Sequence, residues 1–303
     1  MKAVTRITFT DDNGIKFFGE GPCRLLRCVE KTGSLRAAAM EMEMAYSKAS
    51  KILKQAEANL GFPLTTRVSG GKDGGGSILT NEGKRWLQQY EAYRNACVEA
   101  NRELYRQFFP QIGCVIMASG LGKRFGGNKL MADFHGKPMI QRALKATDGL
   151  FAKRVVVTRH ESVAELCREL NVDVVLHDLP HRSDTVRLGL EALGDLDACM
   201  FLPGDQPLLR RETVAMLLEH WKQNPDCMVR PIYEDTEGSP VLFPAWAFPE
   251  LRNLPEGYGG GYVIKNHRET VCCVSVTNSF ELADADTPEL LETLKGLYRD
   301  SNI

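Results

Sequence analysis

A glycine-rich segment at 119–129, SGLGKRFGGNK, holds the residues best suited to chemistry in this 303-residue chain. Backbone N–H groups of such a loop can converge on an anion, and glycines let the main chain approach it closely. Lys123, Arg124 and Lys129 add positive charge, which suits a triphosphate. The segment is not a P-loop, because no Gly-Lys pair in the chain precedes Ser or Thr, and it misses the dinucleotide pattern G-x-G-x-x-G by one residue.

Carboxylates in two further segments are candidate metal ligands. Asp205 follows an apolar run in LPGDQP at 202–207, and Asp284 and Asp286 lie in DADTPE at 284–289. Mg²⁺ favours one or two carboxylates together with phosphate oxygens, so these residues could hold Mg²⁺, or Mn²⁺, beside a triphosphate. A plainer explanation stays open, because a strand-end Asp often caps a helix and Asp286 precedes the helical pattern PELLETLKGL.

These segments belong to a β–loop–α alternation that follows Pro110. The apolar, β-branched runs that we expect to be strands lie at 113–119, 154–159, 173–177 and 198–205. The predicted helices between and after them lie near 138–147, 161–170 and 183–193. The alternation predicts an α/β domain over 111–303, Rossmann-like, with a mostly parallel sheet covered on both faces. Ligands of such sheets bind at the carboxyl ends of the strands, where the glycine-rich segment and Asp205 are expected.

Residues 1–110 show a different pattern. The expected elements are a strand pair within 2–18, helices at 22–31, 34–44 and 46–59, β-like runs at 64–68 and 77–79 around a glycine-rich tip, and a helix from 81 to 108. Gly33 and Gly61 are placed to end helices, and Ser34 and Thr80 to cap the next ones. Helices, a glycine-tipped hairpin and a long closing helix predict a winged helix-turn-helix domain.

The third predicted helix carries a basic face. Lys48, Lys51 and Lys54 recur every three residues and therefore share one side, with Ser47 near the start of the helix. A DNA major groove accepts such a helix, and Arg67 and Lys72 on the hairpin are candidates for phosphate contacts. An ordinary solvated basic face is the alternative.

Charge is divided unevenly along the chain. Residues 1–110 contain 17 Lys and Arg against 12 Asp and Glu, whereas the remainder contains 21 against 27. The basic first part fits a polyanionic partner, and the acidic remainder argues against a nucleic-acid role for the larger part.

Composition is that of an ordinary globular protein, with 43% hydrophobic and 25% charged residues. No apolar stretch is long enough to span a membrane, and the first residues lack the apolar core of a secretory signal. The nine cysteines show no C-x-x-C spacing, which is typical of reduced thiols. We therefore expect a cytoplasmic protein without a membrane partner.

Residues 112–297 resemble the MobA/MocA family of molybdenum-cofactor nucleotidyltransferases. The resemblance rests on the 119–129 loop, similar to the signature A-G-x-x-x-R-x-G-x-x-K, and on ordered motifs: GKP at 136–138, HRSDTVRLGL at 181–190, GDQPLL at 204–209, GSPVLFP at 238–244, GGGYVIKNH at 259–267 and DADTPELL at 284–291. The resemblance implies transfer of CMP or GMP from the triphosphate to the phosphate of molybdopterin, with release of pyrophosphate.

The same resemblance implies roles for particular residues. Lys129, Arg124 and Asp205 are the expected catalytic residues, with Asp205, Asp286 and Asp284 as metal ligands. The expected nucleotide-binding residues are Ala118, Ser119, Gly120, Leu121, Gly122, Lys123, Thr185 and Gly204. The expected acceptor-binding residues are Gln206, Gly238, Pro240 and Gly260. The GDQP motif resembles the cytidylyl branch and favours CTP over GTP, while Ser119 departs from both branches and its hydroxyl could hydrogen-bond a base.

Residues 20–95 resemble the N-terminal domain of ModE, the molybdate-responsive regulator related to LysR-type winged helices. The resemblance is carried by TGSLRAAAMEMEMAYSKASKILKQAEANLG at 32–61 and PLTTRVSGGKDGGGSILTNEG at 63–83. It implies DNA binding and a homodimer formed through residues 80–108. No downstream segment resembles the family's molybdate-binding domains.

Rival interpretations remain open from the sequence. The second domain could bind a nucleotide or cofactor only as the effector of a transcriptional regulator, or transfer a nucleotide to another acceptor such as a sugar phosphate. The first domain could dock a protein partner instead of DNA. A molybdoenzyme or its chaperone is a further possible partner, as recipient of the product.

Overall fold

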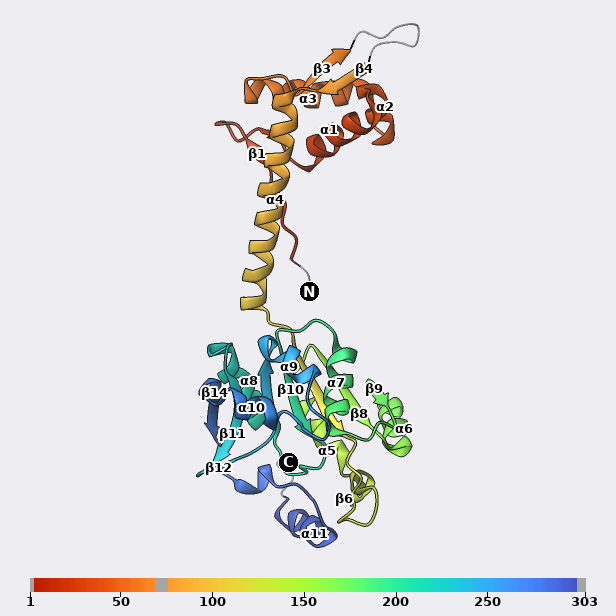
Figure 1. Cartoon of the computed structure of the whole chain (residues 1–303), viewed down its shortest axis with the longest axis vertical. Helices are drawn as coiled ribbons and strands as arrows, with labels where there is room; N and C mark the ends of the chain where they lie inside the picture. Colours follow the sequence, from red (N-terminus) through yellow and green to blue (C-terminus); the bar gives the residue numbers. More distant parts are fainter. Residues whose placement is uncertain (1–2, 69–75, 299–303) are drawn as a thin grey trace. The chain divides into compact units, whose positions relative to one another are not determined.

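The computed structural model describes residues 3–68 and 76–298. The chain divides into two compact units, Met1–Phe108 and Phe109–Ile303, whose elements are labelled in Figure 1. Within the described residues, no helix combines the length and the apolar composition that crossing a bilayer requires.

The first unit has the expected order of elements. They are β1 (Phe9–Thr10), β2 (Lys16–Phe18), α1 (Glu20–Thr32), α2 (Leu35–Glu41), α3 (Tyr46–Leu60), β3 (Thr65–Val68), β4 (Gly76–Leu79) and α4 (Asn81–Phe108). β1 pairs with β2, and β3 with β4, in antiparallel fashion. The expected tip of the second hairpin falls largely on residues 69–75, outside the described part of the chain.

The predicted helices are found, although α1 begins two residues earlier than predicted and α2 ends at Glu41, three residues before the predicted end. The predicted caps between them have local causes. Gly33 ends α1 with a left-handed φ of 67°, a conformation that glycine adopts without steric cost. Ser34 then caps α2, because its hydroxyl accepts a hydrogen bond from the backbone N–H of Ala37. Thr80 caps α4 in the same way, with its hydroxyl 2.8 Å from the nitrogen of Gly83.

Only the first part of α4 joins the core of this unit. Leu87 and Tyr90 are buried there, and Tyr90 packs edge-on against Phe18 with ring centroids 5.0 Å apart. Farther along the helix, Leu104 and Phe108 are 53% and 74% exposed. Large apolar side chains are therefore left uncovered on the second half of α4.

The second unit is built on one mixed sheet. Its strands are β5 (Ile112–Ala118), β8 (Lys153–Thr158), β9 (Val174–Leu176), β10 (Ala198–Pro203), β11 (Met228–Tyr233), β12 (Thr236–Glu237), β13 (Val241–Pro244) and β14 (Val271–Ser275). Their order is β12-β11-β13-β10-β5-β8-β9, with β14 paired to β11. The pairs among β10, β5, β8 and β9 are parallel, as expected, while β13 runs antiparallel to both β10 and β11.

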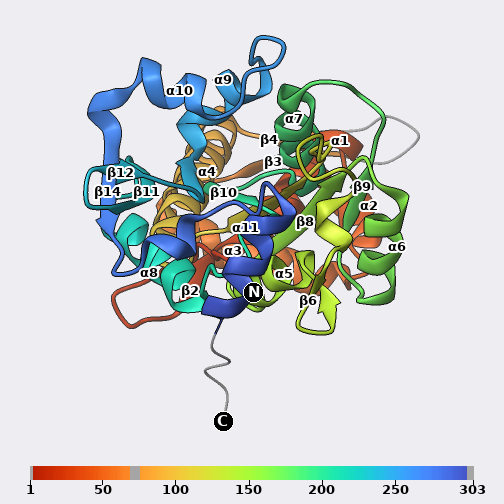
Figure 2. The same ribbon diagram turned by 90° about the horizontal axis from the view of Figure 1, so that it is seen from below.

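Helices cover both faces of this sheet, as Figure 2 shows. The helices are α5 (Ile140–Thr147), α6 (Glu161–Glu169), α7 (Arg182–Leu193), α8 (Arg211–Gln223), α9 (Phe248–Arg252), α10 (Gly261–Asn266) and α11 (Pro288–Leu297). Buried residues of α5, α6, α8 and α11 form one core cluster, and those of α7, α9 and α10 form the other. Successive residues of β5 alternate between the clusters, Ile116 facing one and Val115 the other, as the two-residue period of a strand requires.

The pairing of β5 with β10 brings the predicted site segments together. The two strands are parallel and in register from Ile112 opposite Ala198 to Met117 opposite Pro203. The backbone N–H of Gly204 donates to the carbonyl of Met117 over 3.0 Å. The glycine-rich loop after β5 and Asp205 after β10 therefore leave the same edge of the sheet side by side.

Candidate active site

The glycine-rich loop folds back on itself before the short 3₁₀ helix η1 (Lys129–Met131). The backbone N–H groups of Phe125 and Gly126 donate to the carbonyl of Gly122, at 2.9 and 3.0 Å. Gly122 has a φ of 59°, and a Cβ added there would lie 2.0 Å from the carbonyl oxygen of Gly127. Only glycine therefore fits this point of the loop.

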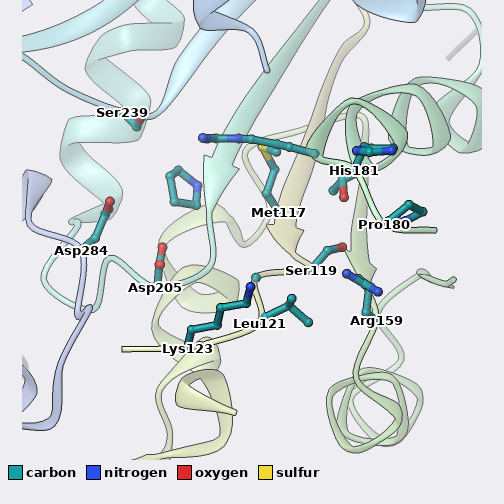
Figure 3. Close-up of a pocket in the computed structure, with 15 residues that line it drawn as sticks. Met117, Ser119, Leu121, Lys123, Arg159, Pro180, His181, Asp205, Ser239 and Asp284 are labelled. Carbon is teal, nitrogen blue, oxygen red and sulfur yellow. The ribbon is translucent and has the colours of Figure 1, made fainter. Parts of the chain in front are cut away.

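A pocket of about 470 Å³ opens beside this loop (Figure 3). The expected nucleotide-binding residues that line it are Ser119, Gly120, Leu121, Gly122, Lys123 and Thr185. Asp205 and Asp284 line it as well. In Figure 3, Asp284 and Ser239 lie on one side of the pocket and Arg159 and His181 on the other.

Lys129 lies buried between two of the predicted carboxylates. Its Nζ is 2.5 Å from Asp205 Oδ2 and 2.8 Å from Asp286 Oδ1. Burial alone lowers the pKa of a lysine, but the hydrogen bonds and charges of these two carboxylates outweigh burial and raise the pKa of Lys129. Arg124 Nη2 also contacts Asp286, at 2.5 Å. The hydrogen bond from Lys129 lowers the pKa of Asp286, which therefore stays ionised between two cations.

Asp284 has a different environment from Asp286. Its Oδ1 accepts a hydrogen bond from Nε2 of Gln206 at 3.0 Å. Burial, followed by the nearby charge of Asp205, raises the pKa of Asp284. Gln206 is 2% exposed and also donates to the carbonyl of Leu282, so it holds the Asp284 segment in place and does not line the pocket.

These residues fit a divalent cation brought with a nucleotide. Within the described ranges, no group of three or more His, Cys, Asp and Glu side chains is arranged to hold a metal alone. Asp205 and Asp284 nevertheless face one pocket, and the charge of Asp205 disfavours ionisation of Asp284. A cation sharing oxygens of both carboxylates and of phosphate would relieve this repulsion. Asp286, the third predicted ligand, is instead engaged by Lys129 and Arg124.

The alternative that Asp286 caps the last helix is wrong. The hydroxyl of Thr287 caps α11 by accepting from the backbone N–H of Leu290 at 3.2 Å. Because Thr287 satisfies the helix end, the Asp286 carboxylate is free to turn toward Lys129. Upstream, the 3₁₀ helix η4 (Ser279–Leu282) is anchored by Glu281, which is 1% exposed and accepts hydrogen bonds from Arg210 and Thr213 at the start of α8.

Ser119 is engaged by protein groups. Its hydroxyl donates to the carbonyl of Val157 over 3.1 Å and lies 2.9 Å from Nε2 of His177. The Nδ1 atom of His177 is buried without a hydrogen-bond partner among the described residues. The expectation that this hydroxyl meets a nucleotide base is therefore weakened, although Ser119 still lines the pocket.

Other predicted residues stand behind the pocket surface. Ala118 is 1% exposed, and its carbonyl accepts a hydrogen bond from Thr158. Gly204 packs against the backbone of Met117, where a Cβ would come within 3.2 Å of the carbonyl oxygen. Ala118 and Gly204 therefore position the adjacent residues Ser119 and Asp205, which line the pocket.

A second pocket of about 560 Å³ borders the predicted acceptor-binding segments. Gly260 lines it, together with aromatic side chains including Phe243, Tyr258 and Tyr262. Gly238 and Pro240 do not line it, but they flank Ser239, which lines both pockets. The carbonyl of Gly238 accepts hydrogen bonds from Arg230 at 2.9 and 3.1 Å, so this turn orients an arginine of the second pocket.

Several pocket residues were not predicted from the sequence. Arg159, His181 and Arg182 line the first pocket, and Arg182, Arg230 and Lys265 line the second. His181 and Arg182 open the 181–190 motif, and Arg159 is the last residue of a predicted strand, so these two patterns contained a usable signal. No sequence pattern pointed to Arg230, because the strand that contains it, β11, was not predicted.

The predicted DNA-binding residues form an exposed surface in the first unit. Ser47, Lys48, Lys51 and Lys54 are exposed along α3, while Ala49 and Leu53 on its opposite side are buried. Arg67 is exposed on β3. Lys72 lies outside the described residues.

Each of the two units matches the model of a known protein family. The model of the MobA-like NTP transferase domain matches residues 114–271, and that of bacterial regulatory helix-turn-helix proteins of the lysR family matches 23–84. The chain is 31% identical over 111 residues to the protein named "Probable molybdenum cofactor guanylyltransferase" of Aquifex aeolicus, covering 36% of this chain and 54% of that protein. It is 31% identical over 131 residues to a 3-deoxy-manno-octulosonate cytidylyltransferase of a Psychrobacter species, covering 41% and 47%.

The chain thus spans about half the length of the curated relatives it matches. Among solved structures, a nucleotidyl transferase from Methanothermobacter thermautotroptrophicus is similar with a TM-score of 0.52 at 22% identity, covering 62% of this chain and 97% of that one. A Mycobacterium tuberculosis protein in complex with manganese has a TM-score of 0.51 at 19% identity, covering 62% and 100%. These structures show a shared fold. The family model of the MobA-like NTP transferase domain covers more than half of the sequence, so the chain belongs to that family. Near its N-terminus the chain also carries a helix-turn-helix of the lysR type.

Proposed function

We propose that this protein transfers CMP from CTP to the phosphate of molybdopterin and releases pyrophosphate. The observation that carries the proposal is the convergence of the glycine-rich loop, Lys129 and the carboxylates of Asp205 and Asp284 at one edge of the sheet. The match to the transferase family model supports the class of reaction, and the name of the Aquifex relative supports molybdopterin as acceptor.

The loop and its cations bind the triphosphate in this proposal. Backbone N–H groups between Ser119 and Lys123 face the phosphates, and Arg124 and Lys129 exchange carboxylate contacts for phosphate contacts. Asp205 and Asp284 would hold Mg²⁺ or Mn²⁺, which supplies charge neutralisation at the reacting phosphates. The protein's own contribution is to hold donor and acceptor in line and to stabilise charge.

The second pocket is the acceptor site in this proposal. Aromatic side chains, among them Tyr258 and Tyr262, offer flat apolar faces to a ring system, and Gly260 keeps the loop close to it. A Cβ at Gly260 would lie 2.7 Å from the ring of Phe243, so a side chain there would push the loop away from the sheet.

GTP as donor is the second candidate. The Aquifex relative is named for guanylyl transfer, whereas the Psychrobacter relative is named for cytidylyl transfer. The Ser119 hydroxyl is hydrogen-bonded to Val157 and His177, so it favours neither cytosine nor guanine.

The direct test incubates the full chain with molybdopterin, Mg²⁺ and either CTP or GTP, and identifies the dinucleotide by mass. We expect a cytosine dinucleotide and pyrophosphate release that depends on molybdopterin. Asp205→Asn should lower turnover at least about a hundredfold, while Asp173→Asn, at an exposed residue before β9, should not. Near-native turnover of Asp205→Asn would refute the assigned role of this carboxylate.

The same assay separates the rival functions. Nucleotide binding without acceptor-dependent pyrophosphate release would favour a sensor domain. Release with a sugar phosphate in place of molybdopterin would keep the reaction class and change the acceptor.

We also propose that the first unit is a ModE-like winged helix that binds DNA. The lysR-type match and the exposed lysines of α3 support DNA binding. The exposed Leu104 and Phe108 on α4 support a homodimer formed through residues 80–108. Sedimentation of the full chain and of a Leu104→Glu, Phe108→Glu variant tests the dimer, with Gln107→Glu as the control for added charge.

A further inference from the structure

The donor and acceptor pockets meet at a small set of residues. Met117, Arg182, Pro203 and Ser239 line both pockets. Met117 and Pro203 are the last pair between β5 and β10, so the residues shared by the two pockets lie at the sheet edge that carries Asp205. Of these shared residues, Arg182 alone is charged.

Arg182 is placed to reach either pocket. It is the first residue of α7, and its side chain is exposed. A Cβ added to Gly259 would lie 2.9 Å from Nε of Arg182, so the absence of a side chain at Gly259 lets the arginine lie along this loop of the second pocket.

Among the described residues, Arg182 has no acidic partner, unlike Lys129, Arg124 and Arg230. Lys129 and Arg124 pair with Asp286, and Arg230 pairs with Glu237 at 2.7 Å. Throughout 3–68 and 76–298, no carboxylate forms an ion pair with Arg182. An exposed guanidinium without a counter-charge that lines both pockets is suited to bind an anion.

We propose that Arg182 binds the attacking phosphate of the acceptor where it meets the α-phosphate of the donor. This role rests on the proposed function. An acceptor phosphate oxygen forms the new bond to the α-phosphorus, the bond from that phosphorus to the bridging oxygen breaks, and its electron pair leaves with pyrophosphate. No proton must move, because a phosphomonoester with a second pKa of about 6 is largely ionised at neutral pH.

The role has a clear physical reason. Both reactants are anions, and their repulsion opposes approach to the distance at which the bond forms. A planar guanidinium can donate two parallel hydrogen bonds to the oxygens of the acceptor phosphate, which a lysine ammonium does less well. The acceptor class is therefore a phosphorylated molecule, and an uncharged alcohol should react poorly.

The test compares wild type with Arg182→Gln and Arg182→Lys. The donor is CTP or GTP, whichever the wild type uses better, at a saturating concentration. The constants kcat and KM are then measured for molybdopterin. Binding of molybdopterin is measured separately, in the presence of an unreactive α,β-methylene analogue of that donor. Arg168→Gln is the matched control, since Arg168 lies on α6, pairs with Glu161 and lines neither pocket.

We expect Arg182→Gln to lose about tenfold or more in kcat/KM and in affinity for molybdopterin, with Arg182→Lys between it and wild type. Affinity for the donor with Mg²⁺ should stay within about twofold. Unchanged acceptor binding, or an equal loss of donor affinity, would overturn the role.

Failure of the proposed function is distinguishable from failure of this inference. A wild type that binds molybdopterin without transferring a nucleotide refutes the transferase, yet the binding comparison still tests Arg182. A wild type that transfers a nucleotide while Arg182→Gln binds the acceptor normally refutes only the role of Arg182. A wild type that does not bind molybdopterin refutes both.

Discussion

Gly122 is the position in the glycine-rich loop that leaves no room for a side chain. Its left-handed φ and the 2.0 Å approach of the Gly127 carbonyl exclude a side chain. Gly122→Ala should therefore lower nucleotide affinity by about tenfold or more, because the added Cβ would disrupt the turn that the Gly122 carbonyl closes with Phe125 and Gly126. Titration with CTP and GTP measures the effect. Gly127→Ala is the control, since a Cβ there meets nothing within 4 Å, and an equal loss in both variants would contradict the argument.

His177 gives a prediction about pH. Burial and the charge of Arg159 lower the pKa of His177, while Asp184 and Asp178 act in the opposite direction. The folded protein therefore takes up this proton less readily than the unfolded chain, whose histidines titrate near ~6.5. Stability should fall as the pH drops below that value, and the fall should be smaller in His177→Gln. Calorimetric unfolding at neutral and mildly acidic pH measures both, and identical pH dependence would refute the role of this imidazole.

The segment η4 is the element that positions the acidic residues. Its buried Glu281 joins it to the start of α8 through Arg210 and Thr213, and Asp284 follows directly. Glu281→Gln should lower the free energy of unfolding by about 1–3 kcal/mol, since a buried hydrogen-bonded charge is lost. It should also raise the Mg²⁺ concentration needed for half-maximal turnover, because Asp284 loses its fixed place. Glu292→Gln, exposed on α11, should change neither quantity.

Elements with strong local signals could be predicted from the sequence. The apolar runs of β5, β8, β9 and β10 and the caps Ser34 and Thr80 depend on neighbouring residues, and the structure confirms them. Strands β11, β13 and β14 were missed. β11 contains Pro231, which interrupts a strand pattern, and β13 is inserted antiparallel between strands distant in sequence.

Some residues that line the two pockets were predicted from the sequence, but their contacts were not. The glycine-rich loop and Asp205 were placed correctly because both follow buried strands. The pairing of Lys129 with Asp286 spans 157 positions, and no local pattern encodes it. Ser119 shows the same limit, since its partner His177 is 58 residues away.

At the scale of the whole molecule, the charge asymmetry gives a prediction for the proposed binding of DNA by the first unit. Lys48, Lys51 and Lys54 are exposed together on α3, so phosphate contacts should release counterions. Binding to a duplex of arbitrary sequence should weaken steeply with salt, and Lys51→Gln should reduce the slope of log affinity against log salt by about one. Fluorescence anisotropy of the labelled duplex measures it.

Lys145→Gln, on α5 of the second unit, is the control for loss of a positive charge. Affinity that does not vary with salt would favour a protein-docking role for the first unit. A slope reduced equally in both variants would show that α3 makes no specific contribution.

The buried Lys129 also has a consequence for how the site fills. The ammonium of Lys129 lies between Asp205 and Asp286 and acts as their counter-ion. It thereby holds the residues around Asp286 against the sheet in the absence of substrate. In the proposed reaction, Asp205 would exchange this ammonium for the divalent cation, and the ammonium of Lys129 could then contact the phosphates. The contacts of Lys129 would thus hold the residues around Asp284 and Asp286 in position before the nucleotide binds.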